Sequence, residues 1–149
     1  MMTQGVQHKA RTPLNALVHP EAIVFDLDGT LLDTIEDLTD AMNAALTNRG
    51  YPRRSVEECK HLVGDGTDVF VRGALPPEAR IPETVADLVI AYRAKYAEIR
   101  PRKTKPYPGI IELLDGLTAR NISMAILSNK RDAVVKQEVS HFLPMTSFA

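Results

Sequence analysis

The sequence predicts an α/β fold in which a parallel sheet is interrupted by a block of helices. Two short apolar runs, at residues 22–25 and 122–127, each end abruptly in a polar loop, as the buried strands of parallel sheets do. Four segments with helical periodicity lie between the two runs. Ligands gather at the carboxyl ends of parallel strands, so we expect a site where the two polar loops meet.

The composition is that of an ordinary globular chain. Of its 149 residues, 44% are apolar and 25% are charged, and a chain of this length can bury a core without disulfides. The one cysteine, Cys59, is expected to be a partly packed thiol. The formal net charge of −1 gives no electrostatic reason to expect a nucleic-acid or membrane partner. No segment resembles a membrane span or a secretory signal, which predicts a cytoplasmic protein.

The first part of the chain leads into a strand and then a helix. Residues 1–20 show no sustained hydrophobic period and are expected to form a flexible extension ahead of the first strand. A helix is expected from residue 35, where apolar residues recur at helical spacing. Asp33 and Glu36 are expected to cap the start of this helix, and Gly50 is expected to end it.

Three further helices complete an all-α insert. Ser55 and Glu58 have the spacing of a capping box and predict a short helix that ends near residue 63. Another short helix is expected over residues 67–75. A long helix is expected to end at Pro101, because one face of the segment before it is apolar: Ile81, Val85, Leu88, Val89, Tyr92, Tyr96 and Ile99.

The segment after the insert returns the chain to the sheet. Residues 101–109 form a proline-rich, basic connector, for which a solvated hinge is a more ordinary interpretation than steering of an anionic substrate. A helix is expected after Pro108, followed by the second strand and by a last helix over residues 134–142.

Asp26 and Asp28 carry the clearest chemical signal. Alternate residues of a strand point the same way, so the two carboxylates are expected to converge on one spot, where they would suit Mg²⁺. A carboxylate can attack phosphorus, and a second carboxyl group can protonate the leaving oxygen. Gly29 permits a sharp turn, and Thr30 adds a hydroxyl and an amide donor. A plain Asp-Gly hairpin turn is the alternative, but a helix follows here and the turn leaves Asp26 unexplained.

The ten residues 25–34, FDLDGTLLDT, resemble the first signature of the haloacid-dehalogenase superfamily. The resemblance implies that Asp26 is the nucleophile and that Asp28 is the general acid and base, with both residues contributing to Mg²⁺ binding, Asp28 through its backbone carbonyl. It also implies a Rossmannoid core with a parallel sheet. Dehalogenases proper lack the second aspartate, so the sequence favours a member that transfers phosphoryl groups.

Ser128 matches the family's second signature, a hydroxyl at the end of the next core strand that binds the phosphoryl group. The tripeptide SNK resembles the form found in phosphoglycolate phosphatases. The resemblance implies that Ser128, Asn129 and the backbone at Gly29 and Thr30 stabilise charge on the phosphoryl oxygens. Taken alone, Ser-Asn after a strand is ordinary turn chemistry.

The helical insert resembles the type 1 cap of this family, a mobile lid over the substrate. The resemblance divides the chain into a helical cap over residues 34–104 and a partial α/β core over residues 21–33 and 105–149. Within the cap, Gly64, Asp65 and Gly66 resemble a substrate-selecting loop, and a plain turn between helices is an equally good interpretation.

The sequence departs from the family after Ser128. The family's third and fourth signatures supply a lysine and an acidic pair for Mg²⁺, but Asp132 and Glu138 are the only carboxylate residues after Ser128. Lys130 and Lys136 are available cations, and neither has the expected sequence context. The family's sheet has at least five strands, whereas two are expected here, which leaves an open edge for self-association. We therefore expect the amino-terminal portion of a longer phosphatase.

Two functions remain open from the sequence. The first is a Mg²⁺-dependent phosphatase that hydrolyses a small phosphorylated metabolite, of the phosphoglycolate type, through an aspartyl-phosphate. The second is a catalytically incompetent fragment, or a binding or assembly protein, derived from such an enzyme.

Overall fold

The computed structural model describes residues 20–99, 101–144 and 146–149. The expected N-terminal extension lies, apart from Pro20, outside these residues. The elements are, in order, β1 (Ala22–Phe25), β2 (Leu32–Asp33), α1 (Ile35–Thr47), α2 (Val56–Lys60), α3 (Thr67–Ala74), the 3₁₀ helix η1 (Pro77–Ala79), α4 (Pro82–Ile99), β3 (Lys105–Pro106), α5 (Ile110–Ala119), β4 (Ser123–Ile126) and α6 (Asp132–Phe142). No helix among the described residues is long and apolar enough to cross a membrane.

The strands β1 and β4 form the expected parallel pair, although they are far apart in the sequence. Their register runs from Ala22 opposite Ser123 to Phe25 opposite Ile126. The carboxyl ends of the two strands therefore lie side by side, and the polar loops that follow them meet at one edge of the sheet. The predicted α/β arrangement, with a helical block between two parallel strands, is confirmed.

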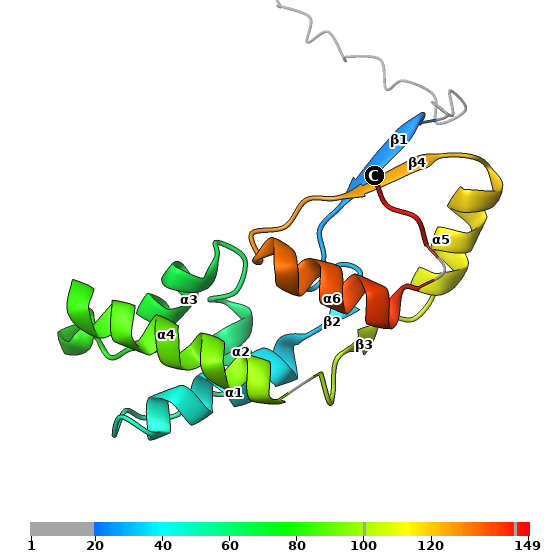
Figure 1. Ribbon diagram of the computed structural model, residues 1–149. Coiled ribbons are helices and arrows are strands. Elements are labelled where there is room, and N and C mark those ends of the chain that lie inside the picture. The colour runs from blue at the N-terminus through cyan, green and yellow to red at the C-terminus, as the bar shows by residue number, and fades with distance from the viewer. Residues whose placement is uncertain (1–19, 100, 145) are drawn as a thin grey trace, which may run out of the picture.

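The described residues form two hydrophobic cores, one in the helical block and one around the strands. The first is built from α1–α4, with Met42, Phe70 and Leu88 among its buried residues. The second contains Leu27 and Leu114, and α6 packs against it. Figure 1 shows α1–α4 together at one end of the molecule, β1, β4 and α5 at the other end, and α6 between them. We refer to residues 34–104 as the helical cap and to the remaining described residues as the core.

The expectation that both core strands are buried is wrong. Val24 in β1 is 62% exposed and Leu127, directly after β4, is 74% exposed. The strands bury side chains against the second hydrophobic core, and Met124 is almost fully buried there. A strand of a parallel sheet is buried on both faces only when both faces are covered, and the outward-facing Val24 lacks such a cover among the described residues.

A short antiparallel pair joins the two segments that connect the cap to the core. β2 pairs with β3, with Leu32 opposite Pro106 and Asp33 opposite Lys105. Asp33 therefore lies in a strand, and its expected role as the cap of α1 is wrong. Thr34 holds the cap position of α1, and its hydroxyl donates to Asp28 instead of to the helix.

Buried Asp37 fastens the returning connector to α1. Its carboxylate accepts the backbone N–H groups of Arg102, Lys103 and Thr104, and the Thr104 hydroxyl donates to the same group at 2.7 Å. The ammonium of Lys103 also lies 2.9 Å from a carboxylate oxygen of Asp40 on α1. These contacts attach the described part of the basic connector to α1, and its role as a hinge stays a prediction.

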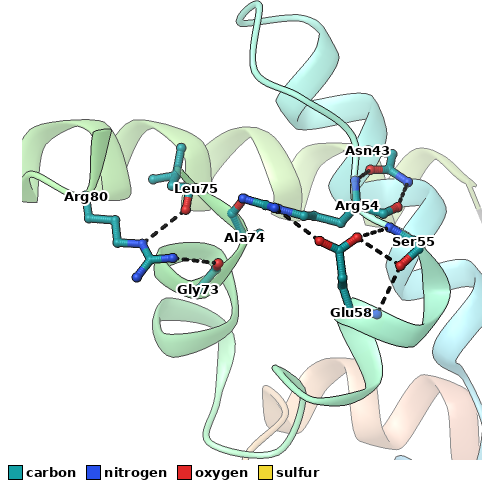
Figure 2. Close-up of polar contacts among 8 residues, drawn as sticks. All are labelled: Asn43, Arg54, Ser55, Glu58, Gly73, Ala74, Leu75 and Arg80. Atoms are coloured by element: carbon teal, nitrogen blue, oxygen red, sulfur yellow. Dashed lines mark hydrogen bonds and ion pairs between the residues drawn. The ribbon is translucent and has the colours of Figure 1, made fainter. Parts of the chain in front are cut away.

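Arginine side chains close the carboxyl end of α3 (Figure 2). The Arg54 guanidinium donates to the Ala74 carbonyl at 2.8 Å, and Arg80 donates to the Leu75 carbonyl at 3.1 Å. Next to Arg54, Ser55 and Glu58 form the predicted capping box at the start of α2. These contacts attach the carboxyl end of α3 to the segment before α2 and to the residue after η1.

Candidate active site

A cavity of about 820 Å³ lies between the helical cap and the carboxyl ends of β1 and β4. The core contributes residues from the loops after both strands and from α6, and the cap contributes residues from the α2–α3 loop, α3 and α4. The polar residues of the wall that matter below are Asp26, Asp28, Tyr96, Ser128, Asn129, Lys130 and Glu138. The two polar loops that the sequence singled out therefore meet at one site.

The two aspartates have different surroundings. Asp26 is exposed, and one of its carboxylate oxygens accepts the Leu27 N–H at 2.7 Å. Asp28 is half-buried, and its Oδ1 accepts the Thr34 hydroxyl at 2.7 Å and the Lys130 ammonium at 2.8 Å. The exposed carboxylate is suited to meet a substrate, whereas the second carboxylate is held in place by two donors.

Gly29 and Thr30 maintain the loop between these aspartates and β2. Gly29 has a φ of 79°, a left-handed conformation that glycine adopts without strain. Its N–H donates to the Leu32 carbonyl at 2.9 Å, and the Thr30 N–H donates to the Leu27 carbonyl at 3.3 Å. Neither residue is among the described residues that line the cavity. The structure thus engages both amides inside the loop and does not bring them to the site.

Ser128 and Asn129 lie in the loop after β4. The Ser128 hydroxyl oxygen accepts the Lys130 N–H at 3.3 Å. The Asn129 amide donates to the Gly64 carbonyl of the cap at 2.7 Å. Gly64 and Gly66 line the cavity, whereas Asp65 is exposed and is not among the described lining residues. Two of the three residues of the candidate substrate loop therefore face the core.

Sequence reasoning missed three residues of the site: Tyr96, Lys130 and Glu138. The Lys130 ammonium lies 2.8 Å from Asp28 and 2.8 Å from a carboxylate oxygen of Glu138, and it donates to the Tyr96 hydroxyl at 3.1 Å. The Tyr96 hydroxyl donates to the other Glu138 oxygen at 2.6 Å. Burial, reinforced by the charge of Glu138, raises the pKa of Tyr96, so its phenol stays protonated.

Two of these residues carried a weak sequence signal. Glu138 is a charged residue three positions after Val135 and next to Val139, both of which pack against the core, so it lies on the buried face of α6. Lys130 is two residues after Ser128, within the tripeptide that resembles phosphoglycolate phosphatases. Tyr96 is one of the apolar positions of the long helix, and nothing in the sequence indicates a hydrogen-bond partner for its hydroxyl.

The oxygen atoms of the two aspartates after β1 are of the kind that Mg²⁺ binds, because Mg²⁺ prefers oxygen ligands and usually retains water molecules. Asp26 offers an exposed carboxylate. The Oδ1 atom of Asp28 already accepts from Thr34 and Lys130, and the family resemblance implies that this residue contributes its backbone carbonyl as the ligand. Within the described ranges, no three His, Cys, Asp or Glu side chains cluster as a metal site, so water and substrate oxygens would have to complete the shell.

Comparison with known proteins decides the family. A family model described as haloacid dehalogenase-like hydrolase matches residues 23–149. The chain belongs to the haloacid dehalogenase-like hydrolases. The match includes both loops of the site and the whole helical cap, in agreement with the resemblance of residues 25–34 to the family's first signature.

Curated relatives of the chain are named phosphoglycolate phosphatases. The chain is 36% identical over 115 residues to the phosphoglycolate phosphatase of Agrobacterium fabrum, covering 73% of this chain and 48% of that protein. It is 34% identical over 131 residues to phosphoglycolate phosphatase 1 of Pseudomonas aeruginosa, covering 85% of this chain and 47% of that protein. The chain thus spans about half the length of these relatives.

Solved structures of the hydrolase family share the fold. The crystal structure of a protein from Lactobacillus delbrueckii subsp. bulgaricus matches this chain with a TM-score of 0.79 at 30% identity. The match covers 87% of this chain and 63% of that chain. The crystal structure of a predicted phosphoglycolate phosphatase from Haemophilus somnus has a TM-score of 0.77 at 26% identity, covering 85% of this chain and 59% of that chain. The predicted core with an inserted helical cap is confirmed at the level of fold.

Proposed function

We propose that the protein is a phosphatase that hydrolyses a small phosphorylated metabolite, of the phosphoglycolate type, through an aspartyl-phosphate. The observation that carries this proposal is the cavity in which Asp26 and Asp28 meet Ser128 beneath the helical cap. The names of the relatives support a phosphate ester of the phosphoglycolate class as the substrate. A cytoplasmic location remains part of the proposal.

The chemistry divides between the two aspartates. The exposed carboxylate of Asp26 attacks phosphorus, and the bond to the leaving oxygen breaks as that oxygen takes the proton of Asp28. Asp28, now a carboxylate, then takes a proton from a water molecule as the water oxygen attacks the aspartyl-phosphate. This second step releases inorganic phosphate and restores Asp26. Thr34 and Lys130 hold Asp28 through both steps.

The phosphoryl oxygens need hydrogen-bond donors, and the loop after β4 is a better source of them than the loop that contains Gly29 and Thr30. Ser128 and Asn129 both line the cavity, so the Ser128 hydroxyl and the Asn129 backbone N–H are the candidate donors, while the Asn129 side chain stays on the Gly64 carbonyl. The Gly29 and Thr30 amides would have to leave the partners they have in the loop. We therefore place the phosphate on Ser128 and Asn129, with Gly29 and Thr30 shaping the loop that presents Asp26.

We include Mg²⁺ as the cofactor, held by the Asp26 carboxylate and by the backbone carbonyl of Asp28. When bound there, it would offset the negative charge that accumulates between Asp26 and the phosphate. We assign to the cap the role of excluding water from Asp26 and the bound phosphate. Gly64 and Gly66 of the cap close one side of the cavity.

The test is hydrolysis of p-nitrophenyl phosphate and of phosphoglycolate by the 149-residue chain, with and without Mg²⁺. We expect Asp26→Asn to lower kcat by at least about 1000-fold, because the nucleophile is lost. Asp115→Asn is the matched control, since Asp115 is an exposed carboxylate on α5 outside the cavity wall. Equal activity of Asp26→Asn and the unchanged chain would contradict the proposal.

A catalytically incompetent fragment or assembly protein is the second candidate. It is favoured by the lack of a three-carboxylate cluster among the described residues, which leaves a metal with few protein ligands. The same assay separates the two candidates. Turnover that disappears in Asp26→Asn excludes the inert fragment, whereas no turnover of either ester by the unchanged chain supports it.

A further inference from the structure

The ammonium of Lys130 is held by three groups that come from three separate parts of the chain. Asp28 follows β1, Glu138 lies on α6, and Tyr96 lies on α4 of the helical cap. The distances from the Lys130 nitrogen are 2.8 Å, 2.8 Å and 3.1 Å, respectively. The contact with Glu138 is an ion pair that lacks the geometry of a hydrogen bond, whereas the other two contacts are hydrogen bonds.

These contacts leave little capacity for a direct role of Lys130 on a substrate. An ammonium has three N–H donors, and three acceptors already surround this one. Its side chain is only 10% exposed, and that of Glu138 is 4% exposed. A substrate anion would have to displace one of the three partners before it could bind the Lys130 nitrogen.

A buried ion pair of this kind is not explained by stability alone. Removing charges from water costs about as much as their attraction returns, so a well-packed apolar pair would serve the core at least as well. Glu138 lies on the same face of α6 as Val135 and Val139, which pack against the core, so an apolar side chain is the usual choice there. The buried carboxylate instead serves to hold a cation next to Asp28.

Tyr96 ties this arrangement to the position of the helical cap. Its hydroxyl donates to Glu138 at 2.6 Å and accepts from Lys130, and the Lys130 nitrogen also lies 5.1 Å from the centre of the Tyr96 ring. If the cap moved away from the core, Lys130 and Glu138 would lose the phenol that bridges them.

We propose that Lys130 is a positioning residue for Asp28, oriented by Glu138 and Tyr96, and that this orientation exists only while the helical cap sits on the core. The inference rests on the proposed phosphatase function and deepens it. In this arrangement Lys130 holds the Asp28 carboxylate where a proton can pass to the leaving oxygen and from the attacking water. Lys130 itself does not contact the substrate, so its loss affects kcat and not substrate binding.

The kinetic test compares Lys130→Met and Tyr96→Phe with the unchanged chain, using p-nitrophenyl phosphate and Mg²⁺. We expect Lys130→Met to lower kcat by about 10- to 100-fold with KM changed by less than about threefold, because misplaced acid–base groups slow chemistry without weakening binding. Tyr96→Phe is expected to lower kcat in the same direction by a smaller factor. Lys136→Met and Tyr51→Phe are matched controls, because Lys136 is 75% exposed on α6 and Tyr51 belongs to the cap outside the cavity wall.

A folding control is needed because Lys130→Met leaves Glu138 buried without its ion-pair partner, which destabilises proteins strongly. The double variant Lys130→Met with Glu138→Gln removes both charges and keeps an acceptor for Tyr96. We expect this variant to unfold near the temperature of the unchanged chain and still to show the loss of kcat. A folded double variant with full activity would overturn the inference.

A readout that does not depend on activity follows the Lys130 ammonium itself by ¹⁵N NMR. Hydrogen bonding and burial should slow its proton exchange enough to give a signal, assigned by its disappearance in Lys130→Met. Asp28→Asn and Tyr96→Phe are expected to shift this signal, whereas Lys136→Met is not. A signal unaffected by both of the first two variants would overturn the contact network whatever the activity.

The remaining outcomes are also decisive. A rise in KM with unchanged kcat in Lys130→Met would overturn the positioning role in favour of direct substrate binding. The unchanged chain could also show no turnover while the Lys130 signal still shifts in Asp28→Asn. That result would overturn the proposed function and the catalytic part of this inference, while the contacts would stand.

Discussion

The Asn129 side-chain amide donates a hydrogen bond to the main-chain carbonyl of Gly64, at 2.7 Å. Asn129 belongs to the loop after β4 and Gly64 to the loop between α2 and α3, so this contact joins the core to the helical cap. A Cβ on Gly66 would lie 3.9 Å from the Asn129 carbonyl oxygen, which shows how closely the two loops approach. Together with Tyr96, the contact holds the cap over Asp26 and Asp28.

Replacing Asn129 by alanine should loosen this side of the cavity. One hydrogen bond contributes about 1 kcal/mol, so opening of the cap loop is expected to become about fivefold more frequent. Hydrogen–deuterium exchange of residues 63–67 measures this opening. Asn48→Ala is the matched control, because Asn48 is exposed at the end of α1. Unchanged exchange in Asn129→Ala would show that the contact does not hold the loop.

Asp37→Asn should weaken the hinge between the cap and the core. The buried carboxylate accepts three backbone N–H groups and one hydroxyl from the connector, and asparagine can replace only part of this acceptor capacity. We expect the free energy of unfolding to fall by about 2 kcal/mol, as for the loss of hydrogen bonds to a charged group. Asp40→Asn, which removes an exposed ion pair with Lys103, is expected to cost much less.

The same carboxylate predicts a dependence of stability on pH. Burial acts to raise the pKa of Asp37, but the hydrogen bonds from Thr104, Lys103 and Arg102 outweigh it and hold the pKa below its ordinary value of 3.8. The stabilisation is therefore complete above pH 3.8 and is lost as the pH falls through the lowered pKa. Urea unfolding across this range should show a steeper acid loss of stability for the unchanged chain than for Asp37→Asn. Equal slopes would contradict this assignment.

The exposed side of the two-stranded sheet should support weak self-association. Val24 is 62% exposed on β1, and within the described residues the outer edge of β1 has no partner strand, so another chain can pair there. Sedimentation velocity over a concentration series should show association that Val24→Lys reduces. Ile90→Lys is the matched control, because Ile90 is 69% exposed but lies on α4 of the cap. A monomer at every concentration, or an equal effect of both variants, would contradict the prediction.

Local patterns in the sequence were enough to predict most of the elements. The capping pair Ser55 and Glu58 and the apolar periodicity of α1 and α4 are local signals, and the structure follows them. Asp33 failed as a helix cap because a partner distant in the sequence, Lys105, draws it into a strand pair. The exposure of Val24 was missed for a related reason, since an apolar strand does not indicate whether helices cover both of its faces.

The site was predicted in part. The places of Asp26 and Asp28 at the end of a strand predict their role, the family resemblance predicts that of Ser128, and the structure brings all three to one cavity. Lys130 and Glu138 give only weak sequence signals and Tyr96 gives none, because the contacts of Lys130 with Asp28, and of Tyr96 with Lys130 and Glu138, span 34 to 102 residues of sequence. A lysine, a glutamate and a tyrosine on helices or loops are ordinary surface or core residues until the cap and core are placed together.

The most direct test of the account asks whether Asp26 becomes phosphorylated during turnover. The chain would be mixed with a ³²P-labelled phosphomonoester and Mg²⁺, quenched in acid within the first turnover, digested and mapped. We expect label on the peptide that contains Asp26, and none when Asp26→Asn is used. Turnover without label on that peptide, or label that persists in Asp26→Asn, would contradict the central claim that Asp26 is the nucleophile.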